Sequence, residues 1–365
     1  MICVRKTDVA VVGAGPAGLS AAAAAAQAGA RVVLIDRSEW CGGQLIKQTH
    51  AFFGSERQYA SVRGIEIARL LTEIVQNLPN AEVMTGCTAL GYYPDDGVLG
   101  LEKEGRFLKL KPKCLIVATG ASERALAFPN NDLPGVYGAG AVQTLMNVYG
   151  VLPGRRVLMV GAGNIGLIVS YQLVQAGAEV AAIVEAAPKI GGYLVHAAKV
   201  RRLGVPILTS HTVKEAHGTD CVEGATIWEL DGAFSPVPGT ERRLEVDVIC
   251  IAVGLSPLAE LLWQAGCAME YVPELGGHVP LRNEFMETSV KGVYVAGDVA
   301  GVEEASSAMV EGRLAGLAAA KSLGCGREED LARQIEEAQK ELAALRSGPV
   351  GEKIRRGLAR VAPGR

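Results

Sequence analysis

Two glycine-rich segments carry the clearest chemical signal in the sequence. Each follows a short apolar run that predicts a buried strand, and each precedes a run that predicts a helix. Their spacing, GxGxxG, suits a pyrophosphate: the first glycine allows a tight turn, the second lets the backbone approach the phosphates, and the third lets helix and strand pack closely. The free N–H groups that begin the helix would then bind the phosphate charge. We predict two sites for adenine nucleotides.

The first segment lies near the N-terminus. Its glycines follow a predicted strand at 8–12 and open a predicted helix at 17–28, and the next strand, at 31–35, is followed by an acidic residue. A carboxylate in that position can accept hydrogen bonds from a ribose. The binding residues that we predict here are Gly13, Gly15, Pro16, Ala17, Gly18 and Asp36.

The second segment repeats this arrangement in the middle of the chain. Its predicted strands lie at 156–160 and 179–184, and Glu185 follows the second of them. The residues Ala186-Ala187-Pro188 offer no arginine for a 2′-phosphate, so NAD(H) is favoured over NADP(H). A site that only holds ADP or ATP, or a fold kept for architecture, remains an alternative. The predicted binding residues are Gly161, Gly163, Asn164, Ile165, Gly166 and Glu185.

The repeat predicts an α/β protein with two Rossmann-like, doubly wound domains, the second inserted into the first. Two similar strand-and-turn segments, at 114–122 and 248–257, mark where the chain would leave the first domain and return to it. A further strand at 292–298 and an Ala/Gly-rich helix at 305–323 would complete the first domain. The predicted parts are 1–125 and 257–325 for the split domain, 126–256 for the insertion, and 326–365 for a charged helix and basic tail.

A third element indicates a flavin. Gly297 and Asp298 end a predicted strand, and a helix follows. The carboxylate can accept a ribityl hydroxyl, while the helix N-terminus can stabilise negative charge on a reduced flavin. Together with the first glycine segment and the turn at Ala118, Thr119 and Gly120, this pair predicts an FAD site built from both ends of the chain.

Other chemistries lack their usual residue patterns. The eight cysteines are scattered singly, which argues against a CxxC pair, a zinc ribbon and an iron–sulfur cluster. Four histidines show no metal-ligand spacing, so we predict no metal site (His196, His211, His217 and His278). The formal charge of −3 comes without a strong basic stripe, so we expect no nucleic-acid binding. Without a signal peptide or an apolar run long enough to span a membrane, the expected location is the cytoplasm.

These features resemble flavoproteins with two dinucleotide-binding folds, the class of thioredoxin reductase. The fragment Gly42-Gly43-Gln44-Leu45, with Phe53-Gly54 further on, resembles the stretch that lies along the FAD in that class. The resemblance implies that Gly43 and Gln44 contact the cofactor. It also places a loop near the isoalloxazine, where a cation or hydrogen-bond donor would stabilise reduced flavin; the candidates in that loop are Lys47, Gln48 and His50.

The resemblance stops at the thiols. Thioredoxin reductases carry their CxxC just before the second glycine segment, and the corresponding stretch here, 140–147, has no cysteine. Other disulfide reductases keep a CxxxxC pair after the first βαβ unit, where Cys41 stands alone. A dithiol mechanism needs an attacking and a resolving thiol, so the sequence argues against disulfide reduction.

The chain is more similar to flavoprotein subunits of heteromeric amine and amino-acid dehydrogenases, such as opine oxidase, hydrogen cyanide synthase, dye-linked proline dehydrogenase and sarcosine oxidase. The similarity lies in 133–136, 138–145 and 311–316. It implies an electron-transferring FAD subunit that works beside a small iron–sulfur protein, a second flavoprotein subunit, or both. The alternatives are a stand-alone NADH-dependent flavin oxidoreductase with a soluble acceptor, and a non-catalytic nucleotide-binding assembly subunit.

The C-terminal tail has two interpretations. An apolar seam runs along an otherwise charged predicted helix, through Leu331, Ile335, Ala338, Leu342 and Leu345, and a small basic tail follows at 351–365. The tail would either pack on its own domain or dock a partner. Taken alone, the seam and the tail favour the heteromeric function.

Overall fold

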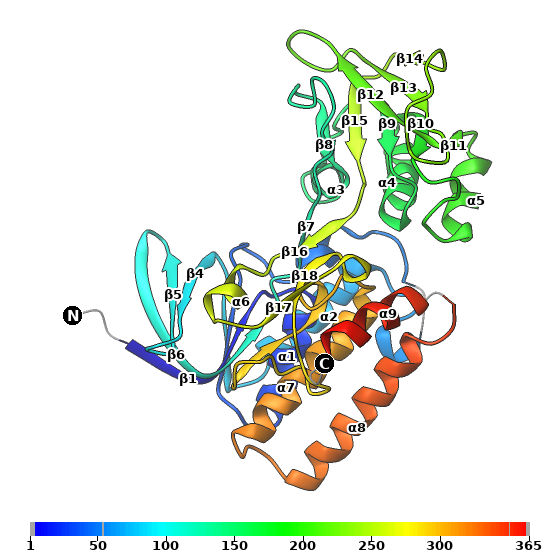
Figure 1. The fold of residues 1–365 in the computed structure, drawn as a ribbon. Coiled ribbons are helices and arrows are strands. Elements are labelled where there is room, and N and C mark those ends of the chain that lie inside the picture. The colour runs from blue at the N-terminus through cyan, green and yellow to red at the C-terminus, as the bar shows by residue number, and fades with distance from the viewer. Residues whose placement is uncertain (1–3, 53–54, 350, 363–365) are drawn as a thin grey trace. The chain divides into compact units, whose positions relative to one another are not determined.

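The computed structural model describes residues 4–52, 55–349 and 351–362. It divides into two compact units, which Figure 1 draws as ribbons: unit 1 comprises Met1–Ser122 and Ser256–Arg365, and unit 2 comprises Glu123–Leu255. Phe53-Gly54 and the last three residues of the basic tail lie outside the described residues.

A seven-stranded sheet forms the centre of unit 1. Its order is β3-β2-β1-β6-β5-β4, with β19 also pairing with β6. The strands β1, β2, β3, β6 and β19 are parallel, whereas β4 and β5 add an antiparallel meander. Both ends of the chain thus contribute to one sheet. The bounds are β1 (Val4–Val12), β2 (Val32–Ile35), β3 (Ala81–Met84), β4 (Cys87–Tyr93), β5 (Val98–Lys103), β6 (Arg106–Val117) and β19 (Val293–Val295).

Small residues let two helices of unit 1 pack closely. A Cβ at Gly312 would lie 2.0 Å from the carbonyl oxygen of Ala17, and one at Gly316 would lie 2.3 Å from that of Ala21. This contact between α1 and α7 explains why both segments are rich in alanine and glycine. The helices of the unit are α1 (Pro16–Gln27), α2 (Gly64–Gln76), α6 (Glu260–Gln264), α7 (Ala305–Ser322), α8 (Glu328–Leu345) and α9 (Glu352–Val361), with 3-10 turns at Gly43–Lys47, Glu56–Gln58, Pro273–Leu275 and Gly297–Val299. A hairpin joins β17 (Met269–Val272) and β18 (Gly277–Pro280).

Unit 2 repeats the parallel sheet on a smaller scale, with the order β11-β10-β9-β15-β8. The strands β12, β13 and β14 form a separate antiparallel sheet. The strands are β8 (Val136–Gly138), β9 (Arg156–Val160), β10 (Glu179–Glu185), β11 (Ile207–Thr209), β12 (His211–His217), β13 (Gly224–Glu229), β14 (Arg242–Leu244) and β15 (Val248–Ile251), and the helices are α3 (Ala139–Asn147), α4 (Asn164–Gln175) and α5 (Leu194–Arg202). The chain passes between the units through β7 (Ala121–Glu123) and β16 (Leu255–Pro257), which pair with each other.

This architecture confirms the predicted fold class, since both glycine segments lie in βαβ units of parallel sheets and helices follow at the C-terminus. No helix among the described residues is long and apolar enough to cross a membrane.

The C-terminal seam is covered by the chain itself. Leu331, Ile335, Ala338 and Leu342 are buried and belong to the same core cluster as α1 and α7. The short helix α9 packs through Ile354, Leu358 and Val361 on the turn between β17 and β18. Using the seam and the tail as support for a docked partner was therefore wrong, because α7 and the β17–β18 turn already bury these apolar side chains.

Candidate cofactor sites

The first glycine segment forms a tight turn from β1 into α1. Gly13 has a φ of +105°, and a Cβ there would lie 2.2 Å from the carbonyl oxygen of Ala118. A Cβ at Gly18 would lie 1.7 Å from the carbonyl oxygen of Gly13. The packing of unit 1 itself requires glycine at both positions.

The second glycine has no such internal requirement. Gly15 has φ −76° and ψ −173°, which any residue adopts, and the nearest described atom to an added Cβ would be the Cα of Gly43 at 3.9 Å. Pro16 takes the first position of α1, and no side chain of the described residues caps the helix start. Open space before free helix N–H groups fits a pyrophosphate that approaches the backbone.

Asp36 is oriented toward this turn. Its carboxylate accepts hydrogen bonds from the backbone N–H of Ala14, at 2.6 Å, and from that of Ser38, at 2.7 Å. The carbonyl of Ala14 in turn accepts a 2.7 Å hydrogen bond from the N–H of Gly42. The carboxylate is thus fixed beside the glycine segment, where a ribose would follow the pyrophosphate.

The loop after Gly42 lies directly against the open space. A Cβ at Gly43 would lie 2.8 Å from the Cα of Gly15, so this close contact also requires glycine. The side chain of Gln44 is exposed, and Lys47, Gln48 and His50 are partly buried in the same loop. The structure therefore places Gly42 and Gly43 against the turn, and contact of the loop residues that follow with a flavin remains a prediction.

The turn at Ala118, Thr119 and Gly120 lies next to the glycine segment. Ala118 donates its N–H to the carbonyl of Val12 at 2.8 Å, and the hydroxyl of Thr119 donates to the carbonyl of Leu258 at 2.7 Å. Gly120 has a φ of +73°, so the chain turns away directly after the strand.

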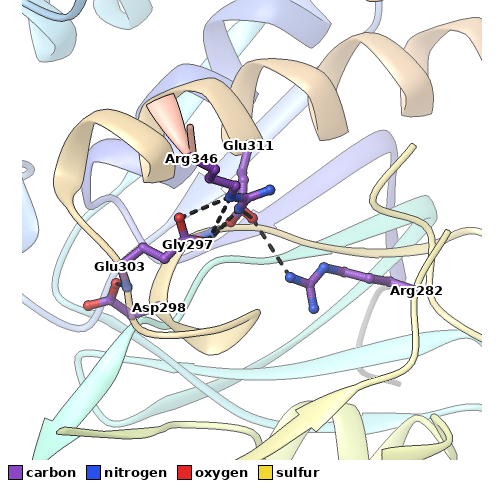
Figure 2. A network of polar contacts seen from close by, with 6 residues as sticks. All are labelled: Arg282, Gly297, Asp298, Glu303, Glu311 and Arg346. Carbon is purple, nitrogen blue, oxygen red and sulfur yellow. Dashed lines mark hydrogen bonds and ion pairs between the residues drawn. The ribbon is translucent and has the colours of Figure 1, made fainter. Parts of the chain in front are cut away.

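Gly297, at the predicted flavin turn, lies against the N-terminal glycine segment. A Cβ at Gly297 would lie 2.8 Å from the Cβ of Ala17, in the first turn of α1. Burial raises the pKa of Asp298 to about 7, and the charges of nearby Glu311 and Glu303 add to that rise, while a backbone hydrogen bond from Glu303 opposes it. Figure 2 shows Asp298 beside this carboxylate cluster.

Unit 2 contains a second cradle with the same geometry. A Cβ at Gly161 would lie 2.3 Å from the carbonyl oxygen of Ala252, and one at Gly166 would lie 2.1 Å from that of Gly161. An added Cβ at Gly163 would meet no atom of the described residues within 4 Å, and its φ of −74° and ψ of 179° suit any residue. As in unit 1, the middle glycine leaves room that the protein does not fill.

Glu185 takes the role that Asp36 has in unit 1. It accepts hydrogen bonds from the N–H of Ala162, at 2.8 Å, and from that of Ala187, at 3.0 Å. The predicted residues Asn164 and Ile165 form the first turn of α4. The carboxylate, the glycine turn and the helix start therefore lie together.

Sequence reasoning missed one part of this second cradle. Gly192 donates its N–H to the carbonyl of Ala162 at 2.9 Å, as Gly42 does to Ala14, and a Cβ there would lie 2.8 Å from the carbonyl carbon of Gly163. Asn164 Oδ1 accepts from the N–H of Tyr193 at 2.8 Å. The signal was present, because Gly191-Gly192 follows Glu185 at the same spacing as Gly42-Gly43 follows Asp36.

The described cysteines form no disulfide. All seven of them are free. Cys41, next to the unit 1 cradle, has its pKa raised to about 11 by burial and by the charge of Asp36. A thiol with so high a pKa is a poor nucleophile at neutral pH.

Comparison with known proteins agrees with this arrangement. The chain is 28% identical over 335 residues to an opine oxidase subunit of Agrobacterium tumefaciens (strain Ach5), covering 87% of this chain and 66% of that protein. It is 29% identical over 331 residues to the alpha subunit of sarcosine oxidase from Rhizobium meliloti (strain 1021), covering 87% of this chain but 31% of that protein. The chain thus spans about two thirds and one third of the lengths of these relatives.

The fold matches a solved disulfide reductase. Thioredoxin reductase of T. acidophilum superposes with a TM-score of 0.72 at 25% identity, covering 87% of this chain and 99% of that one. The family model described as pyridine nucleotide-disulphide oxidoreductase matches residues 7–312. Since that match includes the glycine cradles of both units and the Gly297-Asp298 turn, the chain is an FAD-dependent oxidoreductase of the pyridine nucleotide-disulphide oxidoreductase family.

Proposed function

We propose that the chain is the electron-transferring FAD subunit of a heteromeric amino-acid or amine dehydrogenase. The observation that carries this proposal is that two complete nucleotide cradles occur in a sequence without the CxxC or CxxxxC pair of the disulfide reductases. A family member that lacks the thiol pair has no disulfide outlet, so its electrons must leave to a nicotinamide, to a cofactor on another chain or to a soluble acceptor.

FAD would bind in unit 1. The N–H groups at the start of α1 would hold the pyrophosphate, Asp36 a ribose, and Asp298 the ribityl chain. The cofactor supplies the redox chemistry, since a flavin accepts electrons as hydride or singly. The role of the chain is to bind and orient the flavin. Lys47, Gln48 and His50 are the loop residues that are candidates for stabilising the reduced flavin.

A second adenine nucleotide would bind in unit 2. Support comes from Gly163, because a fold kept only for architecture would not need a residue without a side chain where the protein leaves open space. NAD(H) is the favoured ligand, since Glu185 suits a free ribose hydroxyl. ADP or ATP remains the alternative.

The partners follow from the relatives. Both the opine oxidase chain and the sarcosine oxidase chain are named as subunits. By analogy, a second flavoprotein subunit would oxidise the C–N bond, and a small iron–sulfur protein could relay electrons. The competing function is a stand-alone NADH-dependent flavin oxidoreductase, which the intact cradle of unit 2 favours.

A pair of glycine substitutions tests the two nucleotide sites. Both Gly15 and Gly163 have backbone angles that alanine adopts and room for a methyl group, so Gly15→Ala and Gly163→Ala should fold normally. We expect Gly163→Ala to keep FAD but to weaken NADH binding by roughly tenfold, because the methyl group displaces the pyrophosphate. Gly15→Ala should instead release FAD.

The measurement is an anaerobic titration with NADH and NADPH that follows the loss of flavin absorbance. Gly232→Ala is the matched control, since an added Cβ there also meets no described atom and the site lies away from the cradle residues in sequence. Equal NADH affinity in Gly163→Ala and wild type would exclude the unit 2 cradle as the NADH site. Failure of NADH to reduce the wild-type flavin would point to ADP or ATP.

A further inference from the structure

The end of α8 reaches a buried charge cluster beside the proposed flavin turn (Figure 2). Arg346 Nη2 donates to Glu303 Oε1 and to Glu311 Oε1, each at 2.5 Å, and Arg346 Nε donates to both oxygens of Glu303 at 3.0 Å. The side chains of Arg346, Glu303 and Glu311 are only 11%, 7% and 3% exposed. Arg346 lies beyond residues 7–312, which the family model matches.

Glu311 connects this cluster to the flavin turn. Its other oxygen, Oε2, accepts the backbone N–H of Gly297 at 2.9 Å. Gly297 has little freedom, because its φ is +76° and an added Cβ would lie 2.8 Å from the Cβ of Ala17. The orientation of Glu311 therefore fixes the backbone from which Asp298 projects.

Arg282 cannot replace Arg346 in this role. Its Nη2 lies 3.8 Å from Glu311 Oε1, and neither Nη atom has a hydrogen-bond partner among the described residues. Burial lowers the pKa of the Arg282 guanidinium. Arg346 thus supplies the charged hydrogen bonds that offset the burial of Glu303 and Glu311, and two buried carboxylates without it would repel each other.

We propose that Arg346 is a positioning residue for the flavin site: it holds Glu311 in the orientation that fixes the Gly297-Asp298 turn. The inference rests on the proposed binding of FAD in unit 1. The C-terminal helices, for which the sequence left packing on their own domain and docking of a partner as alternatives, complete the support of the cofactor turn.

Arg346→Lys tests this role. The substitution keeps the buried charge but loses the planar fork that bonds Glu303 and Glu311 at once. We expect the FAD dissociation constant to rise by roughly tenfold, and hydrogen exchange at the peptide that carries Gly297–Val299 to accelerate in the FAD-free protein. Arg313→Lys is the matched control, because Arg313 also pairs across α7 and α8, with Glu341, without contacting Glu303 or Glu311.

The two readouts separate the inference from the proposed function. A wild-type protein that binds no FAD would remove the proposed FAD site, while hydrogen exchange would still report whether Arg346 fixes the turn. Unchanged exchange and FAD affinity in Arg346→Lys would overturn the inference, as would equal effects of the two lysine substitutions. If Arg346→Lys does not fold, Glu311→Gln should accelerate exchange at Gly297, and its failure to do so would also overturn the inference.

Discussion

The glycines of the two cradles have separable roles. Gly13, Gly18 and their unit 2 equivalents meet backbone atoms of the chain, so folding alone requires them, whereas Gly15 and Gly163 meet open space. A sequence motif cannot make that distinction, because all three positions have the same letter. The spacing predicted which residues form the cradles, and the local packing shows which of the glycines leave space that the described residues do not fill.

Arg346 and Glu311 mark the limit of prediction from the sequence at this scale. Glu311 was noted only as part of a resemblance, and the sequence did not single out Arg346. Their pairing depends on α8 returning along α7, and neither residue type nor spacing encodes that contact. Buried ion pairs between distant segments become visible only when the tertiary packing is known.

Asp298 should make the stability of the FAD-free protein depend on pH. The pKa of Asp298 is raised from its ordinary 3.8 to about 7. The folded state therefore binds this proton more tightly than the unfolded chain does. The stability that the Asp298 carboxyl contributes is thus fully present below about pH 4 and is lost as the pH rises to about 7. Asp298→Asn should reduce that loss of stability by about 2–4 kcal/mol, since a tenfold change in proton affinity corresponds to about 1.4 kcal/mol.

Urea unfolding between pH 4 and pH 7 measures this effect as the difference between wild type and variant. Asp96→Asn, at an exposed loop position, controls for the loss of one negative charge. Parallel pH profiles for Asp298→Asn and wild type would show that the carboxyl is not perturbed in the folded protein.

Among the elements, α7 combines several contacts on successive residues. Glu311 bonds the Gly297 turn, while Gly312 and Gly316 let the helix approach α1. The stretch 311–316, which carries the resemblance to amine dehydrogenase subunits, thus has a packing explanation that is independent of substrate.

The sequence pattern did not predict the antiparallel strands β12 to β14. The strand β14 consists of Arg242-Arg243-Leu244, and its pairing with β13 rather than its own residue pattern makes it a strand.

The seam on α8 should contribute to stability rather than to partner binding. Ile335 is 4% exposed in the core that α1 and α7 form. Truncation to alanine should therefore lower the free energy of unfolding by about 2–4 kcal/mol, through lost transfer energy and a residual cavity. Urea denaturation measures the change, and Glu337→Ala, on the exposed side of the helix, should stay within about 0.5 kcal/mol of wild type. A destabilisation as small as that of the control would mean that α8 is not packed on α7.

At the scale of the whole molecule, the order of the elements followed from the internal repeat. The recurrence of strand, glycine turn, helix and strand-end acid predicted two parallel sheets, and the apolar strand before Gly297 predicted the return to the first one, which β19 makes beside β6. The sequence could not show what covers the apolar face of the last helices, since an amphipathic helix packs equally well on its own domain or on a partner. Because the seam is covered by the chain itself, it does not indicate whether electrons leave to a partner subunit or to a soluble acceptor, and activity measurements must distinguish these two outlets.

The proposed division of labour between subunits predicts an asymmetry in electron donors. If C–N oxidation belongs to a partner, the purified chain should not have its flavin reduced by amino acids or amines, because none of the predicted site residues serves a substrate other than the nucleotides. Purification at native levels should yield a second flavoprotein that co-elutes, and the joined proteins should transfer electrons from an amino acid or amine to a dye. Reduction of the isolated flavin by an amino acid would contradict the proposed subunit role. A fully active monomer or homodimer that oxidises NADH and reduces a soluble acceptor would establish the stand-alone oxidoreductase instead.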